Sequence, residues 1–543
     1  KDAQLVGGDK SINVYKVSWL YYDKTNACEA KAKIEADGNN FSNLFRRLLK
    51  LNTVVMPENL ATTGYATFAY SPVTSVSLSP NLTTVGDSTF SACNKLQSID
   101  LPASVTRIGT RAFSGCTALG SISFTSSLTS IGAYAFAGCG FTEFTVPENV
   151  TGISDGLFDG CGKLTSITMP KGLTAIGKRA FAGCAFTEFT VPEGITAISD
   201  ELFSSCDKLK TVTLPKGLTA IGTRAFAGCG FTKFTIPDAI TTISDYLFAN
   251  CPNLEEVTFP KDLKSVGKGI FSGCGFSVFT LPRQITAITD YMFSNCANLG
   301  HIYLHDGLKS IGDYAFQYCN SLGGMTMPAS VTKIGKGCFS HCDYLKEGVT
   351  LSDAITEIPD EAFAFCDNLY EIKLPAELRR IGRYAFEGSY SIGTISGLII
   401  PSKVTEIAEG AFYKSFLGCK DLVLPASLRT IGEYAFYESS AEKIHSFMQV
   451  PLPLSQYNFD MGDRSQCKLY VPKGTAQKYR NAEVWKEFDI EEMDPSGIDG
   501  VTDDAAVKEV GRYDDKGHLL TAPTKGLNIV RYSDGTIKKV VVE

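Results

Sequence analysis

Apolar and polar positions in this chain follow a pattern that returns every 22 to 26 residues, mostly every 22 or 23. One unit reads L-x-x-I-T-(L/M/V)-P-x-x-(L/I/V)-T-x-I-(G/S)-x-x-(A/L)-F-x-x-C, as in "LPKGLTAIGTRAFAGC" at residues 214–229. We take the phenylalanine three places before the cysteine position as the marker of each unit, or rung. The markers are Phe68, Phe90, Phe113, Phe136, Phe158, Phe181, Phe203, Phe226, Phe248, Phe271, Phe293, Phe316, Phe339, Phe363, Phe386, Phe412 and Phe436.

Within one rung, the segment before proline carries apolar and β-branched residues at period two, which predicts a short strand. A second apolar group, Leu173 and Ile176 in one rung, predicts another extended or turn segment. Ala180 and Phe181 are predicted to point inward, and Gly183 to permit a tight bend. No rung can bury its own apolar face, so the rungs must stack. The chain is therefore predicted to be a β-rich repeat solenoid of about seventeen rungs of 22–24 residues, with a parallel sheet on one side.

A second period of 45 residues lies inside the first. Between Phe136 and Phe316 the rungs alternate between C-(G/A)-F-(T/S)-x-F-T, as at Phe141, and C-x-x-L-x-x-(I/V), as at Leu164. This alternation indicates a duplicated two-rung unit. Duplication lengthens a surface without creating a catalytic site, which favours a scaffold or a binding role.

The two ends of the chain depart from the repeat. Residues 1–50 are expected to form an N-terminal cap of short strands and an amphipathic helix at "FSNLFRRLL" (41–49), and 51–472 the solenoid. A capping helix is predicted at 473–490, and the acidic stretch 491–504, with Pro and Gly, is expected to be a linker. Residues 505–543 are predicted to form a small β module with a hairpin turn at Asp534 and Gly535.

Composition excludes several classes of partner. The net charge is −7, and basic residues are spread singly, so no electrostatic footprint for nucleic acid is present. No apolar run approaches the length needed to span a bilayer, so we expect no membrane insertion. We also expect a monomer.

Thirteen of the seventeen cysteines occupy the same repeat position, one per rung. Stacked parallel strands hold side chains farther apart than a disulfide prefers, so the column is predicted to consist of reduced, buried thiols. Serine takes this position at Ser389, Ser415 and Ser439, which favours a small packing residue over a redox group. No C-x-x-C pair suggests zinc.

Candidate chemistry is sparse. His301 and His305 have the H-x-x-x-H spacing of metal ligands, but on a strand that spacing separates the two rings too far for one ion. An ordinary exposed strand is the favoured interpretation. No Ser-His-Asp or Cys-His arrangement stands out, so we expect no enzyme, no catalytic residue, no metal and no cofactor.

Two repeated columns are candidates for binding. Two places before the marker phenylalanine, tyrosine and arginine recur, interrupted by Gly or Glu; both types are frequent in binding hot spots. These rings could instead lean on neighbouring rungs and shield the core. The candidate binding residues are Arg179, Arg224, Tyr246, Tyr291, Tyr314, Tyr384 and Tyr434, and Arg111 and Tyr134 share the column. A threonine column is better explained by strand propensity than by recognition, at Thr145, Thr168, Thr190, Thr213, Thr235, Thr258 and Thr280.

The rung pattern "LPKGLTAIGTRAFAGC" resembles the BspA-like leucine-rich-repeat family of bacterial (Bacteroidetes) surface proteins, over roughly residues 51 to 472. The tail "KGLNIVRYSDGTIKKVVVE" is similar to the C-terminal β tails of exported Bacteroidetes proteins. The resemblance implies a curved solenoid of leucine-rich-repeat type, placed outside the cell or on the outer-membrane surface, with a signal peptide removed before this numbering begins.

The resemblance also implies an adhesin that binds proteins or glycans of the host matrix or of other microbes, but it transfers no functional residue. The function we expect is non-enzymatic recognition of a macromolecule along an extended face of the solenoid. One alternative is a structural spacer on the cell surface with no tight ligand. Another is an accessory to an enzyme or a carbohydrate-processing system.

Overall fold

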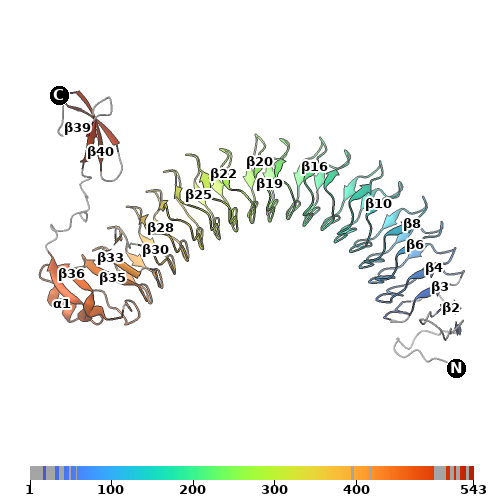
Figure 1. Ribbon diagram of the computed structural model, residues 1–543, viewed down its shortest axis with the longest axis horizontal. Coiled ribbons are helices and arrows are strands. Elements are labelled where there is room, and N and C mark those ends of the chain that lie inside the picture. Colours follow the sequence, from blue (N-terminus) through green and yellow to red (C-terminus); the bar gives the residue numbers. More distant parts are fainter. Residues whose placement is uncertain are drawn as a thin grey trace.

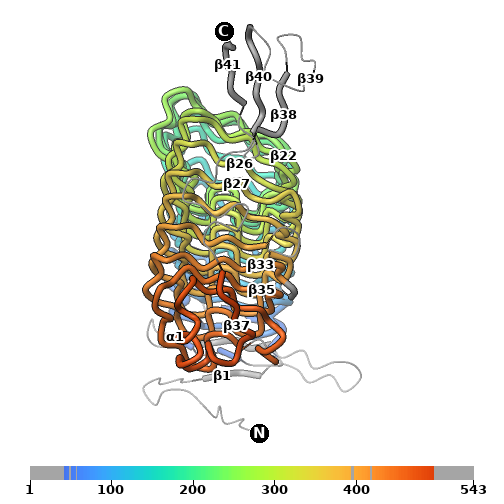
Figure 2. Tube along the Cα trace, turned by 90° about the vertical axis from the view of Figure 1, so that its left-hand side faces the viewer, coloured from blue at the N-terminus to red at the C-terminus, as the bar shows by residue number. Residues whose placement is uncertain are grey.

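The structure is a computed structural model, and it forms an arch of stacked rungs that follow one another in chain order (Figure 1). In a view turned by 90°, β26, β27, β33, β35 and β37 lie in one line along the stack (Figure 2). The curved solenoid implied by the sequence is therefore confirmed. The structure describes residues 16–19, 31–35, 42–43, 45–47, 51–56, 58–392, 397–415, 417–460, 462–493, 509–513, 519–520, 526–532 and 537–542.

Rungs contribute strands to two columns. The first column, which ends near the repeat's proline, contains β3 Thr53–Val55, β4 Ser75–Ser77, β6 Ser98–Asp100, β8 Ser121–Ser123, β10 Glu143–Thr145, β12 Ser166–Thr168, β14 Glu188–Thr190, β16 Thr211–Thr213, β18 Lys233–Thr235, β20 Glu256–Thr258, β22 Val278–Thr280, β24 His301–Tyr303, β26 Met325–Thr326, β27 Val349–Thr350, β29 Ile372–Lys373, β31 Leu398–Ile399, β33 Leu417–Leu424, β35 Ser440–Ser446, β36 Lys468–Pro472 and β37 Asp489–Met493.

The second apolar group of the repeat forms the other column. It contains β5 Thr84–Val85, β7 Arg107–Ile108, β9 Ser130–Ile131, β11 Gly152–Ile153, β13 Ala175–Ile176, β15 Ala197–Ile198, β17 Ala220–Ile221, β19 Thr242–Ile243, β21 Ser265–Val266, β23 Ala287–Ile288, β25 Ser310–Ile311, β28 Glu357–Ile358, β30 Arg380–Ile381, β32 Glu406–Ile407 and β34 Thr430–Ile431. Where neighbouring strands pair, they pair in parallel, and both columns are divided into separate sheets in the middle of the arch. The prediction of a parallel sheet on one side only was therefore incomplete, because the second apolar group of the repeat also forms strands.

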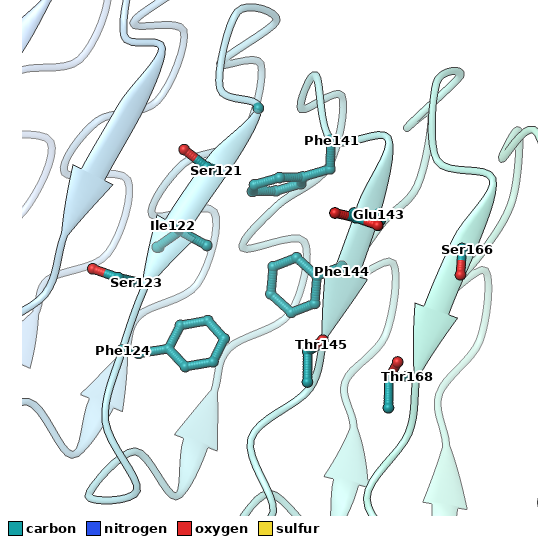
Figure 3. A pocket seen from close by; sticks show the side chains of 11 residues that line it. Ser121, Ile122, Ser123, Phe124, Phe141, Glu143, Phe144, Thr145, Ser166 and Thr168 are labelled. Atoms are coloured by element: carbon teal, nitrogen blue, oxygen red, sulfur yellow. The ribbon is translucent and has the colours of Figure 1, made fainter.

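The first column, which we call the strand face, is divided into two-stranded sheets in the middle of the arch. Its ladders join β6 to β8, β10 to β12, β14 to β16, β18 to β20 and β22 to β24. The division follows the 45-residue period, because Phe144 comes five residues after Cys139 whereas Ile167 comes six after Cys161. Phe144 pairs with Ile167. No ladder joins β8 to β10 in the described chain, although the two strands are neighbours (Figure 3).

The segment around each marker phenylalanine forms the third side of the coil, which we call the turn face. Its hydrogen bonds run from rung to rung without the interruptions of the sheets: the Phe226 amide donates to the Leu247 carbonyl at 3.2 Å, and the Gly228 amide to the Ala249 carbonyl at 2.7 Å. The residues two places before and two places after the marker have positive φ, as at Arg224 (54°) and Gly228 (71°). Where these positions are not glycine, φ lies between 49° and 63°, and none of them is β-branched. Left-handed backbone strains branched side chains most, which explains their exclusion.

The marker phenylalanines form one buried column. Neighbouring rings are stacked, for example Phe203 and Phe226 with centroids 5.8 Å apart and an interplanar angle of 3°. The column also includes Phe45, which stacks on Phe68 at 5.3 Å, and Phe459, which stacks on Phe436 at 4.5 Å. These two rings extend the seventeen predicted markers to nineteen.

The predicted helix at 41–49 is therefore wrong where the structure describes it. Residues 42–43 and 45–47 form turns, and the Phe45 amide donates to the Thr67 carbonyl at 2.8 Å like any other marker. Asn43 and Arg47 have φ of 59° and 60°, the values of the repeat. The spacing of Phe41, Phe45 and Leu49 resembles a helical face, but the described residues 42–43 and 45–47 belong to a first rung.

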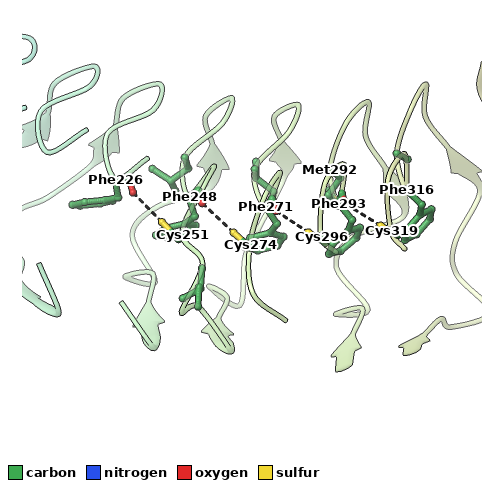
Figure 4. Packing of buried hydrophobic residues seen from close by; sticks show 14 of the residues in the cluster. Phe226, Phe248, Cys251, Phe271, Cys274, Met292, Phe293, Cys296, Phe316 and Cys319 are labelled. Atoms are coloured by element: carbon green, nitrogen blue, oxygen red, sulfur yellow. Dashed lines mark hydrogen bonds between the residues drawn. The ribbon is translucent and has the colours of Figure 1, made fainter. Parts of the chain in front are cut away.

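Each cysteine of the repeat donates its thiol to the carbonyl of the marker phenylalanine one rung earlier. Cys251 bonds to Phe226 at 3.2 Å and Cys274 to Phe248 at 3.0 Å (Figure 4). Ser389 makes the same bond to Phe363 at 2.6 Å. All sixteen cysteines in the described part of the chain are buried and free, which confirms the prediction of reduced thiols.

The C-terminal end of the solenoid contains little helix. The capping helix predicted at 473–490 is not formed as one helix. The segment contains the short helix α1 Ala476–Arg480 and a 3-10 turn at Trp485–Glu487, and strand β37 begins at Asp489. β37 pairs in parallel with β36, so residues 491–493 extend the sheet and do not begin a linker. The rest of the predicted linker lies outside the described residues.

Short strands lie before and after the solenoid. At the N-terminal end, β1 Lys16–Trp19 pairs antiparallel with β2 Lys31–Glu35, and β2 pairs in parallel with β3. In the tail, β38 Glu509–Tyr513, β39 Leu519–Leu520, β40 Gly526–Tyr532 and β41 Ile537–Val542 form an antiparallel sheet. The pairing of β40 with β41 agrees with the predicted hairpin.

Burial makes the thiol column chemically inert. It raises the pKa of Cys251 and Cys296 to about 12, so the reactive thiolate is scarce at neutral pH. We expect an aromatic disulfide reagent at pH 8 to leave the column thiols unmodified in the native protein and to modify them rapidly in guanidinium chloride. Fast native modification of more than one or two thiols per chain would contradict the buried column.

Ser88 has a left-handed backbone, with φ of 55°. At this position we predict that glycine is more stabilising than valine, which is the reverse of the order expected in a strand. We expect Ser88→Gly to be more stable than Ser88→Val by at least about 1 kcal/mol, because valine is strained at positive φ. Arg107, in strand β7, is the matched control, where Val should be more stable than Gly. Urea unfolding of the four variants measures both differences; the same order at both positions would argue against the constraint.

Candidate binding surface

The predicted tyrosine and arginine positions lie on one line along the turn face, which we call the Tyr/Arg column. The register follows from the backbone: the Arg224 amide donates to the Asp245 carbonyl at 3.0 Å, which places Tyr246 directly after Arg224 in the stack. Tyr291 and Tyr314 follow in the same way, through the bond from the Tyr291 amide to the Asp313 carbonyl at 2.9 Å. The seven candidates share one column, with Arg224 exposed and the others half-buried, at Arg179, Arg224, Tyr246, Tyr291, Tyr314, Tyr384 and Tyr434.

Tyrosines in this column alternate with glycines for a steric reason. A Cβ atom at Gly269 would collide with the ring of Tyr246, and one at Gly337 with the ring of Tyr314. Each ring therefore lies over the backbone of the next rung. The same arrangement joins Tyr134 to Gly156 and Tyr384 to Gly410.

Where no glycine follows, the column continues through direct side-chain contacts. Tyr291 and Tyr314 stack with centroids 5.3 Å apart at 14°. The guanidinium of Arg224 lies 4.8 Å from the centroid of Tyr246, and Arg111 lies 5.3 Å from that of Tyr134. Such cation–π contacts contribute roughly 0.5–1 kcal/mol at exposed sites. The rings thus lean on neighbouring rungs while one edge stays open to solvent.

Arg179 differs from the other candidates because its charge is already paired. Its guanidinium bonds to Asp159 at 3.1 Å and also to Glu201, carboxylates of the rungs before and after it. A partner carboxylate would have to compete with both. Arg224, by contrast, is exposed and contacts the ring of Tyr246, so it is the more accessible cation.

Five tyrosines gather where the column reaches the last rungs, a group we call the tyrosine cluster. Tyr413 stacks on Tyr437 at 5.2 Å, and Tyr434 contacts Tyr437 at 5.5 Å and Tyr457 at 5.4 Å. Tyr384 meets Tyr413 edge-on at 6.5 Å. Tyr457 is 42% exposed, so this cluster presents aromatic surface to solvent.

Carboxylates surround the cluster. The Tyr384 hydroxyl donates to Glu409 at 3.2 Å, and Lys414 pairs with Glu438 at 3.2 Å. Burial and the neighbouring Glu361 raise the pKa of Glu387, which shows that carboxylates are crowded here. Lys414 and Arg383 pair with Glu438 and Glu409, so cations already lie beside these carboxylates.

Sequence analysis missed a second aromatic column, two places after the marker. Tyr318 stacks on His341 at 4.5 Å, and His341 stacks on Phe365 at 4.7 Å. Tyr318 and Phe365 are 40% and 37% exposed. The sequence carried a signal for it, because this position, like the Tyr/Arg column, lacks β-branched residues.

The other sequence candidates behave as ordinary strand residues. The threonine column is exposed throughout, as expected from strand propensity. His301 is exposed and packs against Tyr303, whereas His305 bonds through Nε2 to the Pro282 carbonyl at 3.1 Å. Within the described ranges, no group of three or more His, Cys, Asp or Glu residues could hold a metal ion.

Comparison with known families agrees with this architecture. The family model of the BspA type leucine rich repeat region matches residues 41–161, 129–253, 219–346 and 344–457, which together span most of the chain. The chain therefore belongs to the BspA-type leucine-rich-repeat family. No curated protein matches it.

The solved structures that are similar to this chain include three bacterial proteins. A leucine-rich repeat protein from Bacteroides ovatus ATCC 8483 is 24% identical, with 89% of this chain and 100% of that chain covered and a TM-score of 0.47. A leucine rich cell surface protein from Faecalibacterium prausnitzii A2-165 is 24% identical, with 64% and 95% covered and a TM-score of 0.43. The pneumococcal vaccine antigen PcpA is 15% identical, with 88% and 96% covered and a TM-score of 0.32.

None of the helices in the described segments is long and apolar enough to span a membrane.

The contact between Tyr246 and Gly269 can be tested by adding one methyl group. We expect Gly269→Ala to lower the free energy of unfolding by about 1–3 kcal/mol, because the methyl group displaces the ring and φ is 57°. Gly172→Ala is the matched control, since nothing lies within 4 Å of its added Cβ. Denaturant unfolding measures both, and equal stability of the two variants would contradict the ring placement.

Proposed function

We propose that this protein is a non-enzymatic binding protein, of adhesin type, that works outside the cell or on the outer-membrane surface. Its partners would be proteins or glycans of the host matrix or of other microbes. The observation that carries the proposal is the line of aromatic and arginine side chains along the turn face. Tyr and Arg are the residue types that most often dominate binding energy.

Rigidity supports the same proposal. The backbone beneath the Tyr/Arg column is bonded from rung to rung, so Tyr246 and Tyr291 occupy positions set by the stack. Side chains that are already ordered lose less conformational freedom on association. Many weak contacts along such a face can therefore add up to useful affinity.

The contributions within the column should be unequal. Arg224 and the tyrosine cluster offer the most accessible surface, whereas Arg179 is held by Asp159 and Glu201.

A structural spacer remains the second candidate function, and one observation favours it. The rings of Tyr246 and Tyr314 each have a face covered by a glycine of the next rung, which is how side chains that seal the stack would lie. In that case the column stabilises the coil and binds no partner.

The two functions are separated by a binding measurement. We expect the intact protein to bind saturably to at least one member of a panel of purified extracellular-matrix proteins, with a loss of at least tenfold in affinity when Tyr246, Tyr291 and Tyr314 are all changed to Ala. Surface plasmon resonance measures the affinity, and circular dichroism shows that the variant is folded.

The control variant changes Thr145, Thr190 and Thr235 to Ala on the strand face, where all three are exposed. It should bind as the wild type does. Equal affinity of the tyrosine variant, or no binding to any matrix protein by the wild type, would favour the spacer.

A further inference from the structure

The aromatic column two places after the marker is part of an exposed surface that the Tyr/Arg column does not use. Tyr318, His341 and Phe365 stack in three successive rungs, with ring centroids 4.5 and 4.7 Å apart. The ring of Phe365 lies over the backbone of Gly388, where an added Cβ atom would come within 2.7 Å of it. Because the rings cover one another's faces, solvent reaches this stack mainly at the ring edges.

The turn itself does not require rings at this position. In the ten rungs from Phe90 to Phe293, the residue two places after the marker is Ala, Gly, Ser or Asn. Those rungs keep the same buried phenylalanine column and the same hydrogen bonds from rung to rung. The coil therefore forms without such a stack, and aromatic groups exposed together in this way are typical of binding surfaces.

A second column runs beside the stack, one place after the repeat's cysteine position. Its members are Asp343 and Asp367 in the rungs of His341 and Phe365, and Tyr390 in the next rung. Tyr344, which directly follows Asp343, is exposed as well. We call this group the acidic aromatic surface, and its members, all exposed or half-buried, are Tyr318, His341, Asp343, Tyr344, Phe365, Asp367 and Tyr390.

The two carboxylates of this surface lie close together and lack a partner. Their turn segments are joined by the bond from the His341 amide to the Ala364 carbonyl at 2.8 Å. Burial and the charge of Asp343 raise the pKa of Asp367, while His341 acts in the opposite direction. Among the described residues, neither carboxylate has an ion pair or a hydrogen bond.

The two lysines that border this surface are already engaged. Lys346 donates to the hydroxyl of Tyr344 and lies 4.2 Å from the centroid of that ring. Lys414 pairs with Glu438 at 3.2 Å. The pair of aspartates is therefore left to a cation from outside the chain.

The same coil shows which cation suits carboxylates on different rungs. Arg179 places its guanidinium between Asp159 and Glu201, carboxylates of the rungs before and after it. Arg380 spans the carboxylates of two rungs in the same way, at 2.7 and 3.2 Å. A guanidinium holds five N–H donors in a fixed plane and can bond to two carboxylates at once, which the compact ammonium of lysine does less well.

We propose that the acidic aromatic surface binds an arginine side chain on a basic segment of a partner protein. The guanidinium bonds to Asp343 and Asp367, and the methylene stem packs along the ring edges of the stack. This assignment extends the proposed binding role to a second surface and names the chemistry of its partner. It does not require the Tyr/Arg column.

The probe is a dye-labelled peptide of four Gly-Arg repeats, titrated into the intact protein and followed by fluorescence polarisation. Two comparison peptides carry citrulline or lysine in place of every arginine. Citrulline keeps the shape of the side chain and removes its charge. We expect saturable binding of the arginine peptide, at least tenfold tighter than that of the citrulline peptide and at least threefold tighter than that of the lysine peptide.

The decisive variant carries Asp343→Asn and Asp367→Asn together, which removes both charges with almost no change of shape. It should bind the arginine peptide at least tenfold more weakly than the wild type. Phe365→Ala should weaken binding by a smaller factor, because it removes only the apolar contact.

The matched control carries Asp207→Asn and Asp262→Asn, two exposed carboxylates whose loss changes the net charge by the same amount. Asp207 also follows the cysteine of its rung, but Ser205 stands there in place of an aromatic ring. This variant should bind as the wild type does. Circular dichroism checks that all the variants are folded.

The proposal is overturned if the arginine peptide does not bind, or if the citrulline or lysine peptide binds equally well. It is also overturned if the variant of Asp343 and Asp367 loses no more affinity than the control. The triple variant of Tyr246, Tyr291 and Tyr314 should bind the arginine peptide normally, and a tenfold loss there would assign the peptide to the Tyr/Arg column instead. A failed peptide titration leaves matrix binding by that column untouched, so the two results are distinguishable.

Discussion

The hydrogen bonds between the turn segments of consecutive rungs are the constraint on which the rest of the structure depends. They require two left-handed residues in each turn, as at Arg224 and Gly228, and they bring the marker phenylalanines into one stack. The ring separations of Phe203, Phe226 and Phe248, 5.8 and 6.1 Å, then set the spacing at which every outer side chain must pack. A rung depends mainly on its two neighbours, which makes stability local along the chain.

The same spacing explains why the outside of the turn face carries aromatic residues. A ring at Tyr246 can cover the backbone of the next rung only if Gly269 follows, whereas Tyr291 is followed by a ring that stacks on it. Outer residues can therefore serve the stack and still leave edges open to a partner. This double use is why a spacer and a binding protein would look alike on this face, and why binding measurements are needed to separate them.

The strand face differs from the turn face because its sheets are divided, and the division follows the duplicated two-rung unit. A rung that lacks one residue between its cysteine and its strand, as at Cys139, keeps its turn bonds but loses the ladder to the preceding strand. The turn segment has the same length in both kinds of rung, because the missing residue lies after the cysteine. A single short rung, copied with its neighbour, thereby accompanies repeated breaks in both strand columns, while the hydrogen bonds of the turn face continue from rung to rung.

The amino-acid sequence by itself determined the repeat, the strand before proline, the buried Phe226 and Cys229, and the reduced state of the thiols, because each follows from a local pattern repeated many times. It also indicated which residues share the Tyr/Arg column. It misassigned Phe45 to a helix, because one isolated turn has the same apolar spacing as a helical face. Only the tertiary structure decided that Arg179 is ion-paired and that β8 and β10 do not pair. It also decided that Tyr318, His341 and Phe365 stack on one another. These features depend on distances between rungs, which the period of the sequence does not give.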